Sequence, residues 1–360
     1  MCGFWLICCG RRRKRAQIVH DIAAQRKDSK MKSCSCSWLV AMALTSIFTT
    51  VVSVRAQPSW KPEKPVEIIV ESSPGAGVDR IARVMQKFMQ ESGLVATPVN
   101  VIYKPGGAGN IAYNYLQQFS GDAHYVATAT ATLLTNHALG LSSLNYTEFT
   151  ALSVLYSEYI GFAVNADGPL KTGMDLIERV RKNPESLTFA FGTSRGNANH
   201  IGIALAMKAA DIDPRKLKIV LYKASIDATT AMMGGHVDVV ATPASTYTPV
   251  MASGKVRIIA IAAPKRVGGQ FAGVPTWREQ GLDVVAPAYR MVIGPKGLNA
   301  GQTAFWDTLL QRLAKSDAWK KELDQNGWSD IQMTSAESTR YLDTQYAQYR
   351  SILVELGLTK

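Results

Sequence analysis

The chain has 360 residues, 47% of them hydrophobic, which is enough for two domains with buried cores. Its formal net charge of +12 is concentrated at the N-terminus, because ten of the 40 Lys and Arg residues but only two of the 28 Asp and Glu residues lie in residues 1–56. The remainder carries +4, so composition does not indicate a nucleic-acid partner.

The N-terminal segment has the three parts of a secretory signal peptide. Met31-Lys32 is followed by the apolar run Trp38–Val54 and by a small-residue cleavage site that ends at Ala56. We therefore expect residues 31–56 to be a signal peptide, cleaved before Gln57, and residues 1–30 to be a non-native extension from a start codon assigned too early. An uncleaved anchor is the alternative, since the run is just under membrane-spanning length.

The cysteine and histidine content bounds the chemistry of the mature chain. All five cysteines precede the cleavage site, which excludes disulfides, cysteine nucleophiles and thiolate metal sites and suits an oxidising compartment. The later histidines show no metal-ligand spacing, so we predict no metal and no cofactor. They are His124, His137, His200 and His236.

Two successive segments read as strand, glycine-rich loop and helix. In the first, strand Val66–Val70 leads through loop Glu71–Val78 into a helix with apolar residues at helical spacing. The second has strand Val99–Tyr103, loop Lys104–Gly109 and a helix for which Asn110 is the expected cap. The apolar helix residues are Ile81, Val84, Met85 and Phe88 in the first unit and Ile111, Tyr115, Leu116 and Phe119 in the second.

Both loops are suited to an anion, because glycines turn backbone N–H groups toward one point and the following helix adds the positive end of its dipole. Neither loop is a nucleotide signature. Arg80 stands where a dinucleotide-binding loop has its third glycine, and Lys104–Asn110 lacks the Gly-Lys-Ser/Thr ending of a phosphate loop. A carboxylate fits better than a pyrophosphate. The alternative is that both are ordinary tight turns.

Strand and helix patterns alternate from Val66 to Val256, which predicts parallel sheets covered by helices. A strand is expected at His124–Ala129, followed by a threonine-rich turn that begins at Thr130. The further predicted elements are strands Leu187–Phe191, Leu217–Tyr222, Val237–Ala241 and Val256–Ala262, and helices Thr172–Asn183, Asn199–Ala210, Asp227–Met233 and Ser245–Ala252.

Two long extended stretches, Tyr156–Val164 and Val284–Ile293, are placed where a chain would cross between two lobes and return. The tail Ala300–Leu356 reads as purely helical and should pack on a lobe built earlier. We predict an α/β protein with a discontinuous first lobe, residues 57–158 with 290–360, and a second lobe, residues 159–289. Ligands in such folds bind at the lobe boundary, beyond the strand ends.

A third loop, Gly192–His200, follows a predicted strand and opens a helix. It also matches the G-x-S-x-G motif of serine hydrolases, with Ser194 as the nucleophile. His200 starts the same helix and His236 sits in a tight turn, so an exported serine hydrolase is the runner-up, and a hydrogen-bonding loop is favoured. Tyr222-Lys-Ala-Ser225 offers further polar groups at a strand end.

The loop motifs recur in one order along nearly all of the mature chain. In these motifs the chain resembles the tripartite tricarboxylate transporter substrate-binding proteins, also called Bug receptors. The matching segments are Lys64–Val70, Pro74–Asp79, Lys104–Ile111, Gly192–Ser194, Asn199–His200, Tyr222–Ser225, Met233–Asp238, Ser253–Ala260, Gly273–Thr276 and Glu279–Gly281.

The resemblance implies a periplasmic, monomeric, two-lobed receptor of the type II binding-protein fold, with no catalytic activity, that closes on a small organic acid. It would deliver this ligand to the membrane permease subunits of a tripartite tricarboxylate-type transporter. The family's binding loops correspond to Ser72–Asp79, Gly106–Asn110 and Thr193–His200, and in members with charged ligands the residue matching Asp79 can read a second polar group.

Arg195 and Arg290 depart from the usual family pattern, and at the cleft they would favour a second anionic group; the alternative is that both lie on the solvated rim. Dicarboxylates, tricarboxylates, aromatic acids and amino acids remain open as ligands, as does a role in signalling. The predicted ligand-binding residues are Ser72, Ser73, Gly75, Gly77, Asp79, Gly107, Ala108, Asn110, Thr130, Thr193, Ser194, Arg195, Asn197, His200, Tyr222 and Arg290.

Overall fold

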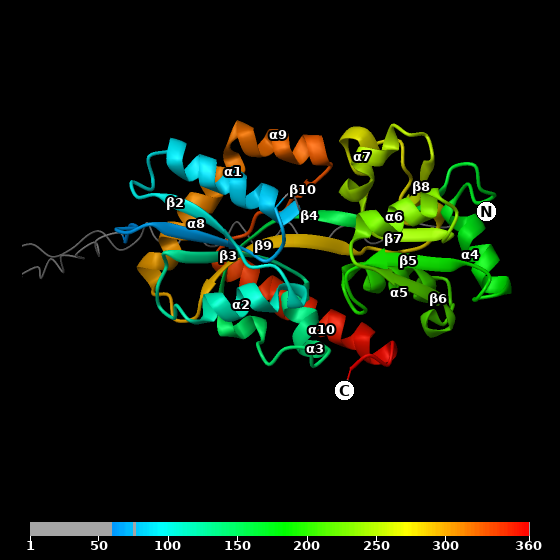
Figure 1. Cartoon of the computed structure of the whole chain (residues 1–360), viewed down its shortest axis with the longest axis horizontal. Coiled ribbons are helices and arrows are strands. Elements are labelled where there is room, and N and C mark those ends of the chain that lie inside the picture. The colour runs from blue at the N-terminus through cyan, green and yellow to red at the C-terminus, as the bar shows by residue number, and fades with distance from the viewer. Residues whose placement is uncertain (1–59, 75–76, 360) are drawn as a thin grey trace, which may run out of the picture. The chain divides into compact units, whose positions relative to one another are not determined.

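The computed structural model describes residues 60–74 and 77–359, which fold around one mixed sheet (Figure 1). Its main path runs β2-β1-β3-β9-β4-β7-β5-β6, and β8 and β10 pair with β4 beside that path. The strands are β1 (Val66–Val70), β2 (Val99–Tyr103), β3 (Tyr125–Thr130), β4 (Phe149–Asn165), β5 (Thr188–Gly192), β6 (Lys218–Tyr222), β7 (Val239–Pro243), β8 (Val256–Ile261), β9 (Pro287–Pro295) and β10 (Ser329–Asp330).

Helices cover both faces of this sheet (Figure 1). Several have well-formed caps; Thr172 and Thr334, for example, each complete a capping box at the start of α4 and α10. The helices are α1 (Gly77–Glu91), α2 (Asn110–Gln117), α3 (Thr132–Ala138), α4 (Gly173–Lys182), α5 (Ala198–Ala209), α6 (Ser225–Met233), α7 (Thr248–Met251), α8 (Ala300–Lys315), α9 (Asp317–Asn326) and α10 (Ser335–Glu355).

In the first half of the sheet, β1 lies parallel to β2 and β3, and β9 is antiparallel to β3 and β4. Successive residues of β1 point to opposite faces, as strand geometry requires. Ile68 packs with residues of α1, α8 and α9, whereas Ile69 packs with residues of α2, α3 and α10. This half therefore has two apolar cores, one on each face.

In the second half, β5 lies parallel to β6 and β7, and β7 and β8 are antiparallel to the end of β4. Phe189 and Phe191 pack with residues of α4 and α5, and Ala190 packs with residues of α6 on the other face. The alternation predicted from sequence holds in both halves. Each half of the sheet therefore lies between two layers of helices.

β4 joins the two halves as one continuous strand. Its residues 149–159 pair with β9, and residues 160–165 pair with β7 and β8. The predicted extended stretch Tyr156–Val164 lies within β4, and Val284–Ile293 leads into β9. β4 and β9 are antiparallel to their neighbours. Parallel pairing is therefore confined to the outer strands, and the centre of the sheet is antiparallel. Residues 56–360 cluster as one unit, so the division into two lobes at residues 158 and 290 stays a prediction.

Three local predictions are wrong. Asn110 is the first residue of α2 and Gly109 is its cap; the Asn110 side chain instead donates to the carbonyl of Leu141 and accepts from Asn136. The threonine-rich turn contains helix α3. The tail is not purely helical, because β10 pairs with β4; a two-residue strand is too short to leave an alternating pattern in sequence.

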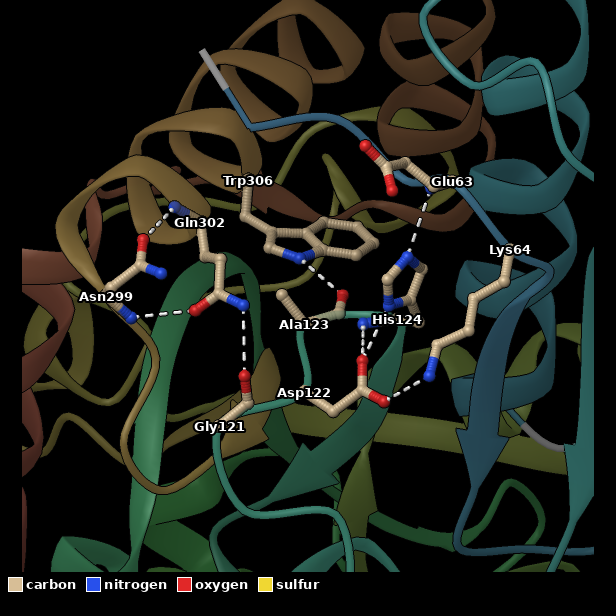
Figure 2. A network of polar contacts seen from close by, with 9 residues as sticks. All are labelled: Glu63, Lys64, Gly121, Asp122, Ala123, His124, Asn299, Gln302 and Trp306. Carbon is tan, nitrogen blue, oxygen red and sulfur yellow. Dashed lines mark hydrogen bonds and ion pairs between the residues drawn. The ribbon is translucent and has the colours of Figure 1, made fainter. Parts of the chain in front are cut away.

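A network of paired polar groups lies at the amino-terminal ends of β1 and β3 (Figure 2). Asp122 accepts from Lys64 Nζ at 2.7 Å and contacts His124 Nδ1 at 2.6 Å, and His124 Nε2 accepts from the backbone N–H of Glu63. Beside them, Trp306 of α8 is fully buried and its Nε1–H donates to the carbonyl of Ala123. The network connects the start of the described chain to the first core, which is the apolar core that contains Ile68 and Trp306.

The predicted extension, residues 1–30, and the predicted signal peptide, residues 31–56, lie outside the described residues. Among the described residues, none of the helices combines the length and the hydropathy needed to cross a membrane.

Candidate functional site

A cavity of about 340 Å³ opens where the two halves of the sheet meet. It lies beyond the carboxyl ends of β3, β5 and β7, with β4 and β9 at its base, which is where ligands bind in α/β sheets. Its lining residues are Gly77, Thr130, Ala131, Thr132, Glu158, Thr193, Asn197, Ala198, Asn199, Ser225, Pro243, Ser245, Thr246, Ala288 and Arg290.

Eight of the fifteen residues that line this cleft carry a hydroxyl or amide side chain, although most of the lining surface is apolar. From the first half come Thr130 and Thr132, whose hydroxyl oxygens lie 2.9 Å apart. From the second half come Asn199 and Ser225, which are joined by a hydrogen bond from the amide to the hydroxyl. Such groups can donate to a carboxylate or accept from a ligand hydroxyl or ammonium group.

An ion pair lies at the base of the cleft. Arg290 Nη2 of β9 is 2.8 Å from Glu158 Oε1 of β4, and both side chains are largely buried. Ser245 donates its hydroxyl to the other oxygen of Glu158, and Arg290 Nη1 donates to the carbonyls of Ala288 and Tyr289. Arg290 Nε is buried and has no hydrogen-bond partner among the described residues. Arg290 is therefore a cleft residue and not a rim residue, but its charge is already paired.

A second carboxylate, Glu71, is buried beside this pair at the end of β1. Thr128 of β3 donates to its Oε2, and Oε1 has no hydrogen-bond partner in the described part of the chain. Burial raises the pKa of Glu71 to about 7, against the opposing effects of the Thr128 hydroxyl, its own backbone N–H and Arg290. Glu71 therefore changes its charge close to neutral pH.

The loop after β5 is held in a strained shape. Thr193 has φ 78°, a region that β-branched residues rarely occupy, and strain of this kind gathers at functional sites. Asn197 supports it, because its amide donates to the carbonyl of Gly192 and to the Thr193 hydroxyl, while its oxygen caps α5. Gly192 admits no side chain, since a Cβ there would lie 2.1 Å from the backbone nitrogen of Ser225.

The same loop lacks the contacts of a serine hydrolase. His200 is buried, and its Nδ1 accepts from the backbone N–H of Gly196. Burial, with a smaller effect of Arg195, lowers the pKa of His200 to about 4. No hydrogen bond joins Ser194 to a histidine within the described ranges, and His236 is exposed in its turn. Ser194 therefore has no general base in this arrangement.

Five of the predicted site residues line the cleft, namely Gly77, Thr130, Thr193, Asn197 and Arg290. Asp79 lies outside the lining, where its carboxylate accepts from the Tyr103 hydroxyl at 2.7 Å and pairs with Arg83. Arg195 is exposed and is also outside it. Gly75 is not among the described residues. The other predicted residues outside the lining are Ser72, Ser73, Gly107, Ala108, Asn110, Ser194, His200 and Tyr222.

The sequence prediction missed most of the second-half wall and the acid at the base. Ser245 and Thr246 directly follow β7, so the rule that ligands bind beyond strand ends could have found them. Ser225 was recognised only as part of a polar strand end. Glu158 leaves no comparable signal, because it lies within β4 and reaches the cleft only through its pairing with Arg290 of β9.

Comparisons with known proteins agree with this fold. A relative from Cupriavidus necator, the UPF0065 protein of the gbd 5′ region, is 26% identical over 340 residues, which cover 89% of this chain and 96% of the relative. An R. palustris protein solved with adipate superposes with a TM-score of 0.72 at 20% identity, over 83% of this chain and 99% of the other. Periplasmic binding protein BugD superposes with a TM-score of 0.70 at 22% identity, with the same coverage.

Residues 81–358 match the family described as the tripartite tricarboxylate transporter family receptor. The match spans most of the cleft-forming elements, from α1 to α10. Together with these superpositions it confirms the family and the α/β binding-protein fold predicted from sequence. Because the family is one of receptors, it also confirms a binding protein in place of an enzyme and gives no support to the hydrolase. This chain belongs to the tripartite tricarboxylate transporter receptor family.

Proposed function

We propose that this chain is a periplasmic receptor that captures a small organic acid in the cleft between the two halves of its sheet. The observation that carries the proposal is the cleft itself: about 340 Å³, with a largely apolar surface, hydroxyl or amide side chains on eight of its fifteen lining residues, and Arg290 at its base. Cavities of this size hold small metabolites, and the donors suit a carboxylate. The R. palustris neighbour solved with the dicarboxylate adipate supports this ligand class.

The receptor would act as a monomer and pass its ligand to the membrane permease subunits of a tripartite tricarboxylate-type transporter. Export rests on the predicted signal peptide, residues 31–56, and on the fold shared with periplasmic binding protein BugD. N-terminal sequencing of the secreted protein tests the cleavage before Gln57. Light scattering of the purified protein tests the monomer, and uptake of the labelled ligand by cells with and without the permease genes tests the partner.

A thermal-shift screen tests ligand binding directly. Protein purified from cells that express the full chain is screened against mono-, di- and tricarboxylates and amino acids. A ligand present at a hundred times its Kd should stabilise the protein by about 2.7 kcal/mol. Silence across the whole panel from a folded protein would refute the carboxylate receptor.

Variants connect a positive result to the cleft. Thr130→Val and Ser245→Ala each remove one hydroxyl from the lining and should weaken binding. Arg195→Ala is the matched control, because Arg195 is exposed and lies outside the lining. Equal losses in the control and the cleft variants would place the ligand elsewhere. Arg290→Ala is less informative, since it would also leave Glu158 buried and unpaired.

A further inference from the structure

Near the base of the cleft, two buried carboxylates share one guanidinium. Arg290 is the cation that acts on both Glu158 and Glu71, so one positive charge serves two buried carboxylates. The two carboxylates are not equally supported. Glu158 receives hydrogen bonds on both oxygens, from Arg290 and from Ser245, whereas Glu71 has one oxygen without a partner among the described residues.

Glu71 lies outside the lining of the cleft, but it is close enough to the lining residue Arg290 for their charges to interact. It follows β1 directly and precedes Gly77, which lines the cavity. Its hydrogen-bond donor, Thr128, stands two residues before Thr130 on β3, and Thr130 pairs with Arg290 across the ladder between β3 and β9. A charge on a ligand beside Arg290 would therefore act on Glu71 through a poorly polarisable interior.

Arg290, Tyr156 and Tyr113 interact electrostatically with Glu71. β9 contributes Arg290, which also pairs with Glu158 of β4, while β4 and α2 contribute Tyr156 and Tyr113; both tyrosines are buried and carry raised pKa values. On α1, the carboxylate of Asp79 is engaged by Tyr103 and Arg83. Arg290 is the cation that acts on Glu71, whereas Arg83 and Arg80 of α1 pair with Asp79 and Glu322, and Arg80 also acts on Tyr156.

We propose that binding of a carboxylate ligand in the cleft is coupled to the uptake of one proton by Glu71. The inference rests on the proposed function, since it needs an anionic ligand. A ligand carboxylate drawn to Arg290 adds a third negative charge around one guanidinium. The least supported carboxylate is the one that is neutralised: a proton leaves solvent or buffer and forms an O–H bond on Glu71.

This coupling makes the affinity for an anion depend on pH. Below neutral pH, Glu71 already carries its proton and the anion binds without further change. Above neutral pH the proton must be taken from solution, so the affinity falls by up to about tenfold for each pH unit until the pKa of Glu71 in the complex is passed. Glu71 would thus set the net charge of ligand plus site, which makes it a specificity-determining residue.

Titration calorimetry with adipate tests the inference, using protein purified from cells that express the full chain. Binding is measured near pH 8 in buffers with different ionisation enthalpies, and the slope of the observed enthalpy gives the number of protons taken up. We expect an uptake on the order of half a proton or more for each adipate bound. Glu71→Gln should bind adipate with no uptake and with an affinity independent of pH.

Two further variants keep the test independent of how well Glu71→Gln folds. Thr128→Val removes the donor that favours the ionised form of Glu71, so proton uptake should begin at a higher pH. Glu91→Gln, which changes an exposed acid of α1, should leave the uptake unchanged.

The binding isotherm reports on the proposed function and the buffer dependence reports on the inference. Adipate binding by the wild-type protein with no buffer dependence overturns the coupling and leaves the receptor intact. Uptake that persists in Glu71→Gln overturns its assignment to Glu71. Absence of binding for adipate and for every other carboxylate of the screen overturns both.

Discussion

The two ends of β1 and β3 are built in opposite ways. Where these strands begin, the polar atoms of Lys64, Asp122 and His124 are matched to one another or to the backbone, and Trp306 and Gln302 bind the carbonyls of the loop before β3 (Figure 2). Where the same strands end, Glu71 and Arg290 each keep a buried polar atom without a partner in the described chain.

We call the end of the sheet where β1 and β3 begin the matched edge and the end where they finish the binding edge. The first serves stability and the second serves binding. A fully matched polar network contributes to stability because no buried group loses its hydration without compensation. An unmatched buried group lowers stability, and it persists where something else binds to it or changes its charge. We therefore expect variants at the first edge to change unfolding with binding intact, and variants at the second edge to change binding or its pH dependence.

Removing the largest side chain of the matched edge should have the largest effect. Trp306→Ala deletes a fully buried indole and its hydrogen bond to the carbonyl of Ala123, which should lower the free energy of unfolding by roughly 3–5 kcal/mol. Urea denaturation measures the loss, and adipate titration below the transition should give the wild-type Kd. A loss of less than about 1 kcal/mol would mean that this edge does not anchor the first core.

The buried acid at the binding edge should make stability depend on pH. The pKa of Glu71 is raised to about 7 in the folded state, so the unfolded chain releases this proton first as pH rises. Its contribution is complete below about pH 4.3, the unfolded value, and is lost progressively up to about pH 7, a change on the order of 3 kcal/mol.

Denaturation series between these pH values measure that slope. Glu71→Gln should remove this part of the decline in stability, since the amide does not titrate. An exposed acid gives the comparison: Glu91→Gln should keep the wild-type slope. If Glu71→Gln and the wild-type protein decline in parallel, then Glu71 does not titrate in this range.

Relieving the strain in the loop after β5 should raise the stability of the protein and weaken ligand binding. Thr193→Gly removes the side chain from a backbone with positive φ, and the gain in stability should be about 1 kcal/mol after the extra flexibility of glycine in the unfolded chain is counted. The loss of the Thr193 hydroxyl from the lining should weaken adipate binding. Asp211→Gly is the matched control, because Asp211 also has positive φ but lies away from the cleft. Weakened binding in both variants would point to a global effect.

The smallest effect is expected from the most exposed member of the matched edge. Lys64→Ala removes one exposed partner of Asp122, while His124 and its backbone N–H continue to hold that carboxylate. Exposed ion pairs contribute little, so the urea midpoint should not move measurably. A clear shift would show that Lys64 is essential to the network.

Much of the fold could be predicted because it depends on local patterns. Alternation of strand and helix signals located β1, β2, β5 and β6 to within a residue or two, and the long extended stretch before Val164 is β4. The central antiparallel pairing was missed, because the strand that inserts between β3 and β4 comes far later in the chain. Local pattern carries no information about such pairing.

The site was only partly predictable for the same reason. Loops after β3 and β5 were recognised by their glycines, threonines and position at strand ends, and they supply Thr130, Thr193 and Asn197 to the cleft. Glu158 meets Arg290 only through the register of β4 and β9, and the unmatched oxygen of Glu71 is a property of the folded core. Tertiary pairing decides these contacts, and a single sequence does not show it.

The place of β9 between β3 and β4 also governs when the chain can fold. Until β9 and the helices after it are available, both neighbouring strands of the first half keep unpaired edges, so the N-terminal half cannot complete its sheet as it leaves the ribosome. Pairing across so long a stretch of chain is slow, because the loop must close before contacts compensate for the lost entropy. If the chain is exported as we propose, this delay would keep the polypeptide open for translocation.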